Sequence, residues 1–133
     1  MSAAKIPEVV ADLFAGKAIA NLATVGAKGQ PMVMPVWVDR EGDRILINSA
    51  GGRVKNRHMI KGALVALAIS DPANPYRYVG VQGRVLEVRT AGADAHIDKL
   101  SQRYLGKSPY PWRKPGDKRE LFVIEPTRIK VQD

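Results

Sequence analysis

The sequence predicts a mainly β protein: a small β-barrel with peripheral helices. Three observations support this fold class. Short apolar runs recur along the chain, turn-forming Gly, Pro, Asn and Asp separate them, and few stretches carry helical spacing. Short strands that follow one another closely are typical of small barrels. The 133 residues contain no internal repeat and no linker, so we expect a single domain over residues 1–133.

Several apolar runs, each ending at a turn signal, are expected to form the strands. They are residues 18–25, 30–38, 44–49, 63–70, 76–90, and a final strand or pair at 121–125 and 128–131. Pro31 and Pro35 make the second segment an edge or bulged strand, because proline cannot donate to the hydrogen-bond ladder. Gly80 and Gly83 predict bends within the long fifth segment.

Helical spacing is confined to three segments. Residues 7–14 predict a short amphipathic helix with Pro7 in its first turn, and a second short helix is expected between Arg53 and Gly62. Residues 91–105 predict a longer helix capped by Gly106. Residues 39–43 and 71–75 are expected to be turns, and residues 107–117 form a loop too rich in proline to be regular.

The composition is that of a soluble globular protein, with 45% hydrophobic and 26% charged residues. The absence of cysteine excludes disulfides and thiolate metal sites, and it fits a reducing compartment. Polar and acidic residues interrupt the apolar run at the N-terminus, which is unlike a signal peptide, and no apolar stretch approaches membrane-spanning length. We therefore expect a cytoplasmic protein with no membrane partner.

The net charge of +8 favours anionic ligands. Nucleic acid, acidic lipid and a polyanionic small molecule all satisfy that charge. Aromatic residues make up only 6% of the chain, and it has neither a glycine-aromatic RNA-binding signature nor zinc-finger spacing. We therefore favour an anionic small molecule over nucleic acid.

The most informative segment is SAGGRVKNRHMIK, residues 49–61. A strand ends there in a Gly-Gly break, and a short helical segment opens with Arg53, Lys55 and Arg57 and contains no acid. Free backbone N–H groups at a helix start, combined with cations, suit a phosphate or a similar anion. A solvated basic helix face is the alternative interpretation.

Templates for protein-based catalysis fail in this sequence. His58 and His96 lack carboxylates at metal-ligand spacing, so no metal site and no catalytic residue is predicted. His96 is expected to be a surface or packing residue, and Asp39, Glu41 and Asp43 to belong to a solvated turn. If the chain is an enzyme, a cofactor must supply the reactive group.

Two aromatic segments have ligand potential. MPVW at residues 34–37 is an interrupted strand of large residues that can approach a planar ring, although core packing is the simpler interpretation of Trp37. The loop at 107–117 combines Tyr110 and Trp112 with Arg113 and Lys114. A lid, a dimer contact and a rigid loop remain open for it.

The order of several motifs resembles a known superfamily. The motifs are LATV at 22–25, G-x-P at 29–31, PVW at 35–37, R-x-K-x-R at 53–57, DP at 71–72, YVGVQGRV at 78–85, AHIDKLSQRYLG at 95–106, YPW at 110–112 and the closing IEP. With these motifs in this order, the chain resembles the split β-barrel, FMN-binding-like flavin reductase superfamily, which is also known as the pyridoxamine 5'-phosphate-oxidase-like proteins. More narrowly, it is similar to their coenzyme F-420 (deazaflavin)-dependent oxidoreductase branch.

This resemblance implies a homodimer with cofactor sites at the subunit interface. Cations after the third strand hold the cofactor phosphate in that family, which corresponds here to Arg53, Lys55 and Arg57. Gln82 matches a position that reaches across the dimer. The tricyclic ring lies against the second and third strands, which corresponds here to Met34, Pro35, Val36, Trp37, Ile47, Asn48 and Ser49.

The implied activity is hydride transfer from reduced coenzyme F-420 to an unsaturated or conjugated organic substrate, with solvent as a source of the product proton. FMN ends in one phosphate, whereas the deazaflavin tail continues into glutamates and favours a longer basic groove. Candidates for that groove are Lys61, Arg77, Arg113, Lys114, Lys118 and Arg119. The alternatives are an FMN-dependent oxidase or reductase, a non-catalytic cofactor-binding protein, and a nucleic-acid-binding barrel. The family's C-terminal pyridoxal-phosphate signature is missing, which argues against a true pyridoxamine-phosphate oxidase.

Overall fold

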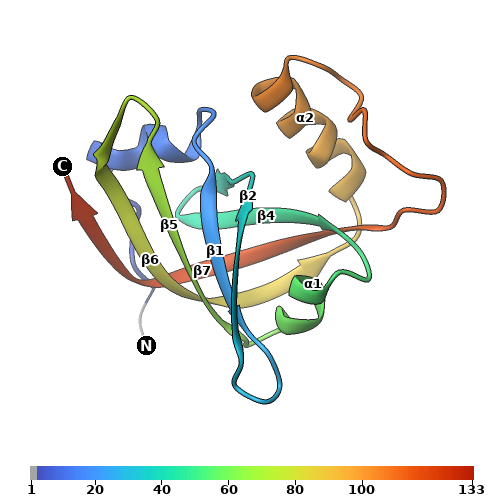
Figure 1. The fold of residues 1–133 in the computed structure, drawn as a ribbon, viewed down its shortest axis with the longest axis horizontal. Helices are drawn as coiled ribbons and strands as arrows, with labels where there is room; N and C mark the ends of the chain where they lie inside the picture. The colour runs from blue at the N-terminus through green and yellow to red at the C-terminus, as the bar shows by residue number, and fades with distance from the viewer. Residues whose placement is uncertain (1–2) are drawn as a thin grey trace.

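The computed structural model describes residues 3–133 and shows a mainly β split barrel. All strand pairs are antiparallel, and the strands form one curled sheet in the order β2-β1-β5-β6-β7-β4-β3 (Figure 1). The strands are β1 (Ala20–Val25), β2 (Pro31–Val36), β3 (Asp39–Glu41), β4 (Arg44–Ala50), β5 (Leu64–Asp71), β6 (Asn74–Arg89) and β7 (Arg119–Gln132). The predicted fold class is therefore confirmed.

Three helical segments accompany the sheet. The first, η1 (Glu8–Phe14), is a 3-10 helix, and α1 (Val54–His58) has only five residues. The helix expected after Arg53 is thus too short to contribute a useful dipole to anion binding. The longer α2 (Ala93–Leu105) ends at Gly106, whose left-handed φ of 70° matches the predicted cap. In Figure 1, α2 flanks one side of the barrel and continues into the long loop that leads to β7.

Two predictions about the strands are wrong. Residues 39–41 were expected in a turn but form β3, which pairs with Arg44, Ile45 and Leu46 of β4. The last strand was expected to break at Pro126, yet β7 runs through it. Pro126 lies opposite Gly83, where the register of β6 against β7 shifts, so its missing N–H falls at an irregularity of the ladder.

Gly83 shows why this bulge requires glycine. A Cβ atom at that position would lie 2.7 Å from the carbonyl oxygen of Glu125 and 2.9 Å from the side chain of Ile124. The backbones of β6 and β7 therefore approach too closely for any side chain at residue 83. The predicted bend at Gly83 corresponds to this register shift, whereas β6 passes Gly80 in unbroken register.

The core fills the barrel interior. Its largest fully buried side chains include Phe14, Phe122, Leu22, Ile47 and Met59. The 3-10 helix η1 contributes its apolar side chains to this core, and a smaller cluster of Leu46, Ala93, Leu121 and Val123 joins the sheet to α2. Burial of this apolar surface is the main favourable term in folding.

The barrel is open between β2 and β3, the two edge strands of its sheet. The sheet begins at β2 and ends at β3, and β3 covers only the first residues of β4. Asn48 and Ser49, further along β4, pair with β7 on one side only. The placement of Pro31 and Pro35 in an edge strand is confirmed. This open edge determines where a ligand can reach the barrel wall.

Candidate functional site

A cavity of about 380 Å³ lies at the open edge of the barrel. Its lining comes from β2, β4, α1, α2, the loop before β7 and the start of β7. The lining residues are Ile19, Pro35, Val36, Trp37, Asn48, Ser49, Arg53, Lys55, Ile97, Leu105, Tyr110, Trp112 and Arg119. Three of them are cations and none is a carboxylate, so the cavity is built for an anion with an apolar or aromatic body.

Strand register brings the cations together from distant parts of the chain. Ala50 of β4 pairs with Arg119 of β7, and the backbone N–H of Gly51 donates to the carbonyl of Lys118 at 2.7 Å. The Gly51–Gly52 turn then leads directly into Arg53 and α1. Arg119 therefore joins Arg53 and Lys55 at one end of the cavity.

Lys55 and Arg119 are buried without an ionic partner. Lys55 is only 9% exposed and Arg119 only 7%, and no carboxylate of residues 3–133 lies within ion-pair distance of either. Burial, together with the charges of Arg53 and Arg119, lowers the pKa of Lys55 to about 8. Burial likewise lowers the pKa of Arg119. A bound anion would relieve both penalties.

Aromatic side chains form another part of the cavity lining. Trp37 stacks on Tyr104, and the Tyr110 ring lies nearly perpendicular to Trp37 with ring centroids 5.9 Å apart. Trp112 completes the cluster at 6.2 Å from Trp37 and is 60% exposed. The loop that was open to three interpretations therefore forms one wall of the cavity.

Contacts to α2 and to β7 hold this loop in place. Asp98 of α2 accepts hydrogen bonds from the backbone N–H of Tyr110 at 2.8 Å and from the guanidinium of Arg113 at 2.7 Å. The guanidinium of Arg119 lies over the Tyr110 ring, 5.1 Å from its centroid. The aromatic wall and the cationic end are thus directly connected.

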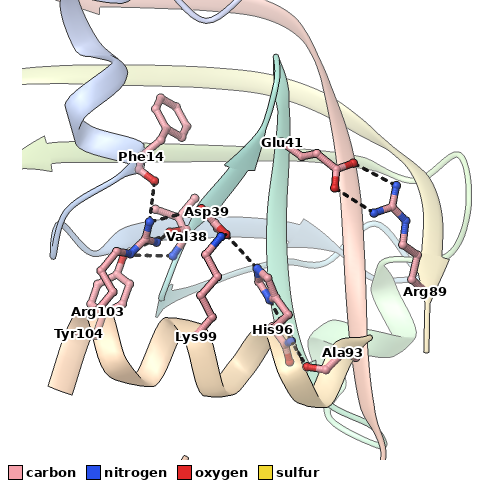
Figure 2. Close-up of polar contacts among 11 residues, drawn as sticks. Phe14, Val38, Asp39, Glu41, Arg89, Ala93, His96, Lys99, Arg103 and Tyr104 are labelled. Atoms are coloured by element: carbon pink, nitrogen blue, oxygen red, sulfur yellow. Dashed lines mark hydrogen bonds and ion pairs between the residues drawn. The ribbon is translucent and has the colours of Figure 1, made fainter. Parts of the chain in front are cut away.

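Behind the cavity, the buried carboxylate of Asp39 is the centre of a partly buried polar network. Figure 2 shows His96, Lys99 and Arg103 reaching it from α2. His96 Nε2 is 3.0 Å from Asp39 Oδ2, and Lys99 and Arg103 each approach at 3.3 Å. Burial raises the pKa of Asp39, but the hydrogen bond from His96 and the nearby cations outweigh burial and bring it well below its usual range. Asp39 is therefore ionised at neutral pH.

The structure places most of the predicted site residues at the cavity. Pro35, Val36, Trp37, Asn48, Ser49, Arg53 and Lys55 all line it. The others do not: Ile47 is fully buried in the core, Met34 lies outside the lining, and Arg57 bonds back to the carbonyl of Gly52. Gln82 lies on the outer face of β6, so its expected contact across a dimer stays a prediction.

Several predictions from the sequence need correction. Asp39 is not in a solvated turn but is buried in β3. His96, expected as a surface or packing residue, packs against β3 and also bonds to Asp39. Arg77 is not available to a ligand groove, because Asp12, Asp71 and Asp133 surround it. One signal for the network was readable: His96, Lys99 and Arg103 follow the i, i+3, i+7 spacing of one helix face.

The described residues hold no group of three or more His, Cys, Asp or Glu side chains suited to a metal ion. Within residues 3–133, no helix has both the length and the apolar character required to cross a bilayer.

The fold and the site together define a split-barrel protein with a cationic and aromatic cavity at its open edge. The sequence profile of the pyridoxamine 5'-phosphate oxidase family matches residues 6–133, and the chain belongs to that family. No match was found among curated proteins.

Solved structures agree with this assignment. An F420 reductase superimposes with a TM-score of 0.80 at 31% identity, covering 94% of this chain and 98% of the other. The HupZ protein of Group A Streptococcus gives a TM-score of 0.70 at 23% identity, with 96% and 95% covered. A conserved hypothetical protein of Mycobacterium tuberculosis gives 0.70 at 19% identity, with 98% and 86% covered. The last two show the fold alone. The family and the F420 reductase place the chain among flavin-type oxidoreductases.

Proposed function

We propose that this protein is a coenzyme F-420-dependent reductase acting on an unsaturated or conjugated organic substrate. One observation carries the proposal. The buried cations Lys55 and Arg119, together with Arg53, converge without a carboxylate beside an aromatic cavity at the open edge of the barrel. The 31% identical F420 reductase supports the choice of cofactor.

The residues of the cavity suit this cofactor in three ways. Arg53, Lys55 and Arg119 would hold its phosphate, since charge-assisted hydrogen bonds to phosphate are strong. Trp37 and Trp112 would contact its ring and exclude water. At Asn48 and Ser49, β4 pairs with a strand on one side only, so backbone groups there would be available to hydrogen-bond the edge of the ring. When bound, the reduced deazaflavin supplies a hydride, so the protein contributes binding, orientation and exclusion of water.

Charge around the cavity favours the deazaflavin over FMN. Beyond the phosphate anchor, Lys114 and Lys118 are exposed on the segment that leads into Arg119. An oligoglutamate tail leaving the cavity would pass this segment, whereas FMN would end at the anchor. We therefore expect the protein to bind coenzyme F-420 more tightly than FMN.

Titration of the purified protein with both cofactors tests this proposal. Arg53→Ala and Lys55→Ala should each weaken F-420 binding by about 1.5–3 kcal/mol, typical of a lost charged hydrogen bond, and the exposed Lys28→Ala serves as control. Added salt should weaken long-tailed F-420 more than a tail-less analogue, because exposed charges are screened beyond about 8 Å at 0.15 M. Tighter binding of FMN at every salt concentration would contradict the cofactor assignment.

We also propose that the protein is a cytoplasmic homodimer that pairs through the outer face of its sheet. A row of paired residues crosses five strands on this face: Val33, Ala23, Ala66, Gln82 and Arg128. Small side chains lie in the middle of the row and Val33, at its end, is 67% exposed. Leu64, two residues along β5 from Ala66 and on the same face, is 63% exposed. A second copy would bury this apolar surface twice.

Sedimentation tests the dimer. The wild type should sediment as a dimer at micromolar concentration, and Leu64→Glu should shift it towards monomer and weaken cofactor binding. Val9→Glu, at an exposed apolar residue of η1, is the matched control and should change neither. A well-folded wild-type monomer would rule out both the dimer and an interfacial site.

A further inference from the structure

A chain of three hydrogen bonds connects Asp39, behind the cavity, with Arg119 inside it. Arg119 Nε lies 2.9 Å from Asn48 Oδ1, and Asn48 Nδ2 lies 3.1 Å from His96 Nδ1. His96 Nε2 is in turn 3.0 Å from Asp39 Oδ2. The four side chains come from β7, β4, α2 and β3, so this chain exists only in the folded barrel.

The orientation of the Asn48 amide is fixed from both ends. Its nitrogen lies 2.8 Å from the carbonyl oxygen of Ala93, which can only accept a hydrogen bond. Its oxygen therefore faces Arg119, whose Nε can only donate. The second N–H of the amide points to His96 Nδ1, and the two donated bonds together fix the plane of the amide.

The tautomer of His96 follows from these contacts. Because Asn48 donates to Nδ1, that nitrogen must accept, and the ring proton must reside on Nε2, where it is donated to Asp39. Asp39 accepts, since it is buried and ionised beside Lys99 and Arg103. In each of the three hydrogen bonds, the donor is thus on the Arg119 side and the acceptor on the Asp39 side. Hydrogen bonds aligned in this way polarise and strengthen one another.

We propose that His96 is a positioning residue that orients Arg119, through Asn48, for binding the anionic group of the ligand. This inference builds on the anion site of the proposed function. Arg119 has no carboxylate partner within residues 3–133, so Asn48 and the Tyr110 ring fix its direction. Because the bond to Asn48 uses Nε, it does not occupy the terminal nitrogens of the guanidinium, which can face the ligand.

Two measurements test this positioning. In ligand-free protein, the Arg119 Nε–H should exchange slowly with solvent, and His96→Phe should accelerate its exchange. His96→Phe should also weaken binding of coenzyme F-420 about five-fold, the size of one lost hydrogen bond. His96→Gln can accept from Asn48 and donate to Asp39. This variant should therefore have the exchange rate and the F-420 affinity of the wild type. Lys99→Met, one turn along α2 and in contact with Asp39 but not Asn48, is the control.

A double-mutant cycle separates positioning from a purely structural role. In an Arg119→Met background, His96→Phe should cause no further loss of F-420 affinity, because there is no guanidinium left to orient. Equal losses in both backgrounds would overturn the proposal.

Nitrogen NMR of wild-type His96 provides a test that needs neither variants nor ligand. A proton on Nδ1 instead of Nε2 would overturn the proposal even if His96→Phe fails to fold. If the wild type fails to bind F-420, the proposed function fails, while the tautomer and the exchange of Arg119 Nε–H still decide the positioning role.

Discussion

Trp37 and Tyr104 stack face to face, with ring centroids 4.9 Å apart and planes within 5° of parallel. The Tyr104 hydroxyl donates to the carbonyl of Ala18 at 2.7 Å and accepts from the N–H of Val38 at 3.1 Å. One side chain of α2 thereby holds the connection between β2 and β3, at the point where the barrel is open and the cavity begins. Because Trp37 lines the cavity, Tyr104 supports the cavity wall from behind.

We expect Tyr104→Phe to lower the free energy of unfolding by about 1–2 kcal/mol, because it leaves the partly buried N–H of Val38 without that partner. Tyr104→Leu should cost about 1 kcal/mol more, since the stack is lost as well. Urea denaturation measures both, and Tyr76→Phe, at an 84% exposed residue, should have no effect. Equal stability of Tyr104→Phe and wild type would show that the hydroxyl contributes nothing.

Lys55→Met should stabilise the ligand-free protein while weakening F-420 binding. Replacing a buried, unpaired cation by an apolar side chain of similar length should raise the free energy of unfolding at pH 7 by about 1 kcal/mol. The folded-state pKa of Lys55, about 8, lies below its ordinary value of 10.5. The unfolded chain therefore binds more protons between these values, wild-type stability rises with pH across that window, and the advantage of the variant disappears.

Melting curves of Lys55→Met and wild type between pH 6 and 10 check this dependence. Lys61→Met removes an exposed lysine outside the cavity and should leave the pH dependence unchanged. A destabilised Lys55→Met at pH 7 would show that Lys55 already has a stabilising partner in the free protein.

Asp39→Asn should destabilise the fold in a pH-dependent manner. The pKa of Asp39 is lower in the folded state than in the unfolded chain, so its stabilising contribution is complete above about pH 4, the usual range of Asp, and is lost as the pH falls. At pH 7 the substitution should cost about 2–3 kcal/mol, because Arg103 and His96 lose their charged partner. Acid titration of unfolding should show the two proteins converging below pH 3, whereas the exposed Asp94→Asn should follow the wild type. A constant difference at all pH values would contradict an ionised Asp39.

Gly83→Ala should destabilise the barrel by about 1–3 kcal/mol, the usual cost of overpacking, because its Cβ would collide with the carbonyl of Glu125. Gly80→Ala is the matched control on the same strand, since the nearest atom to its Cβ is 4.0 Å away. Thermal unfolding of both variants tests the prediction. Similar melting temperatures would mean that β6 and β7 can separate at little cost.

Trp112→Ala distinguishes among the three interpretations of the loop at 107–117. If the loop covers the ligand, F-420 affinity should fall about five-fold, the value of one aromatic contact, with little change in stability because Trp112 is largely exposed. A shift to monomer in sedimentation would identify a dimer contact instead. Unchanged affinity and unchanged assembly would leave a rigid connection as the only role.

The sequence by itself determined the local features of this protein. Alternating apolar runs and turn residues predicted the strands, and Pro31 and Pro35 predicted that β2 lies at an edge, because a missing N–H has the same consequence in any sheet. Gly106 predicted the end of α2 for a similarly local reason, its left-handed backbone. Arg53 and Lys55 after the Gly-Gly turn predicted an anion anchor, and both residues line the cavity.

Only the tertiary structure decided which distant residues meet. Arg119 reaches Lys55 because Ala50 pairs with Arg119, a register fixed by the whole barrel rather than by either strand. Asp39 and His96 lie 57 residues apart, and their local sequences predicted a turn for Asp39 and a surface or packing residue for His96. The burial of a charged residue depends on its partners, and the partners of Asp39 come together only when α2 packs on the open edge. The cations after the glycine turn could therefore be predicted from the sequence, whereas the network that orients Arg119 could not.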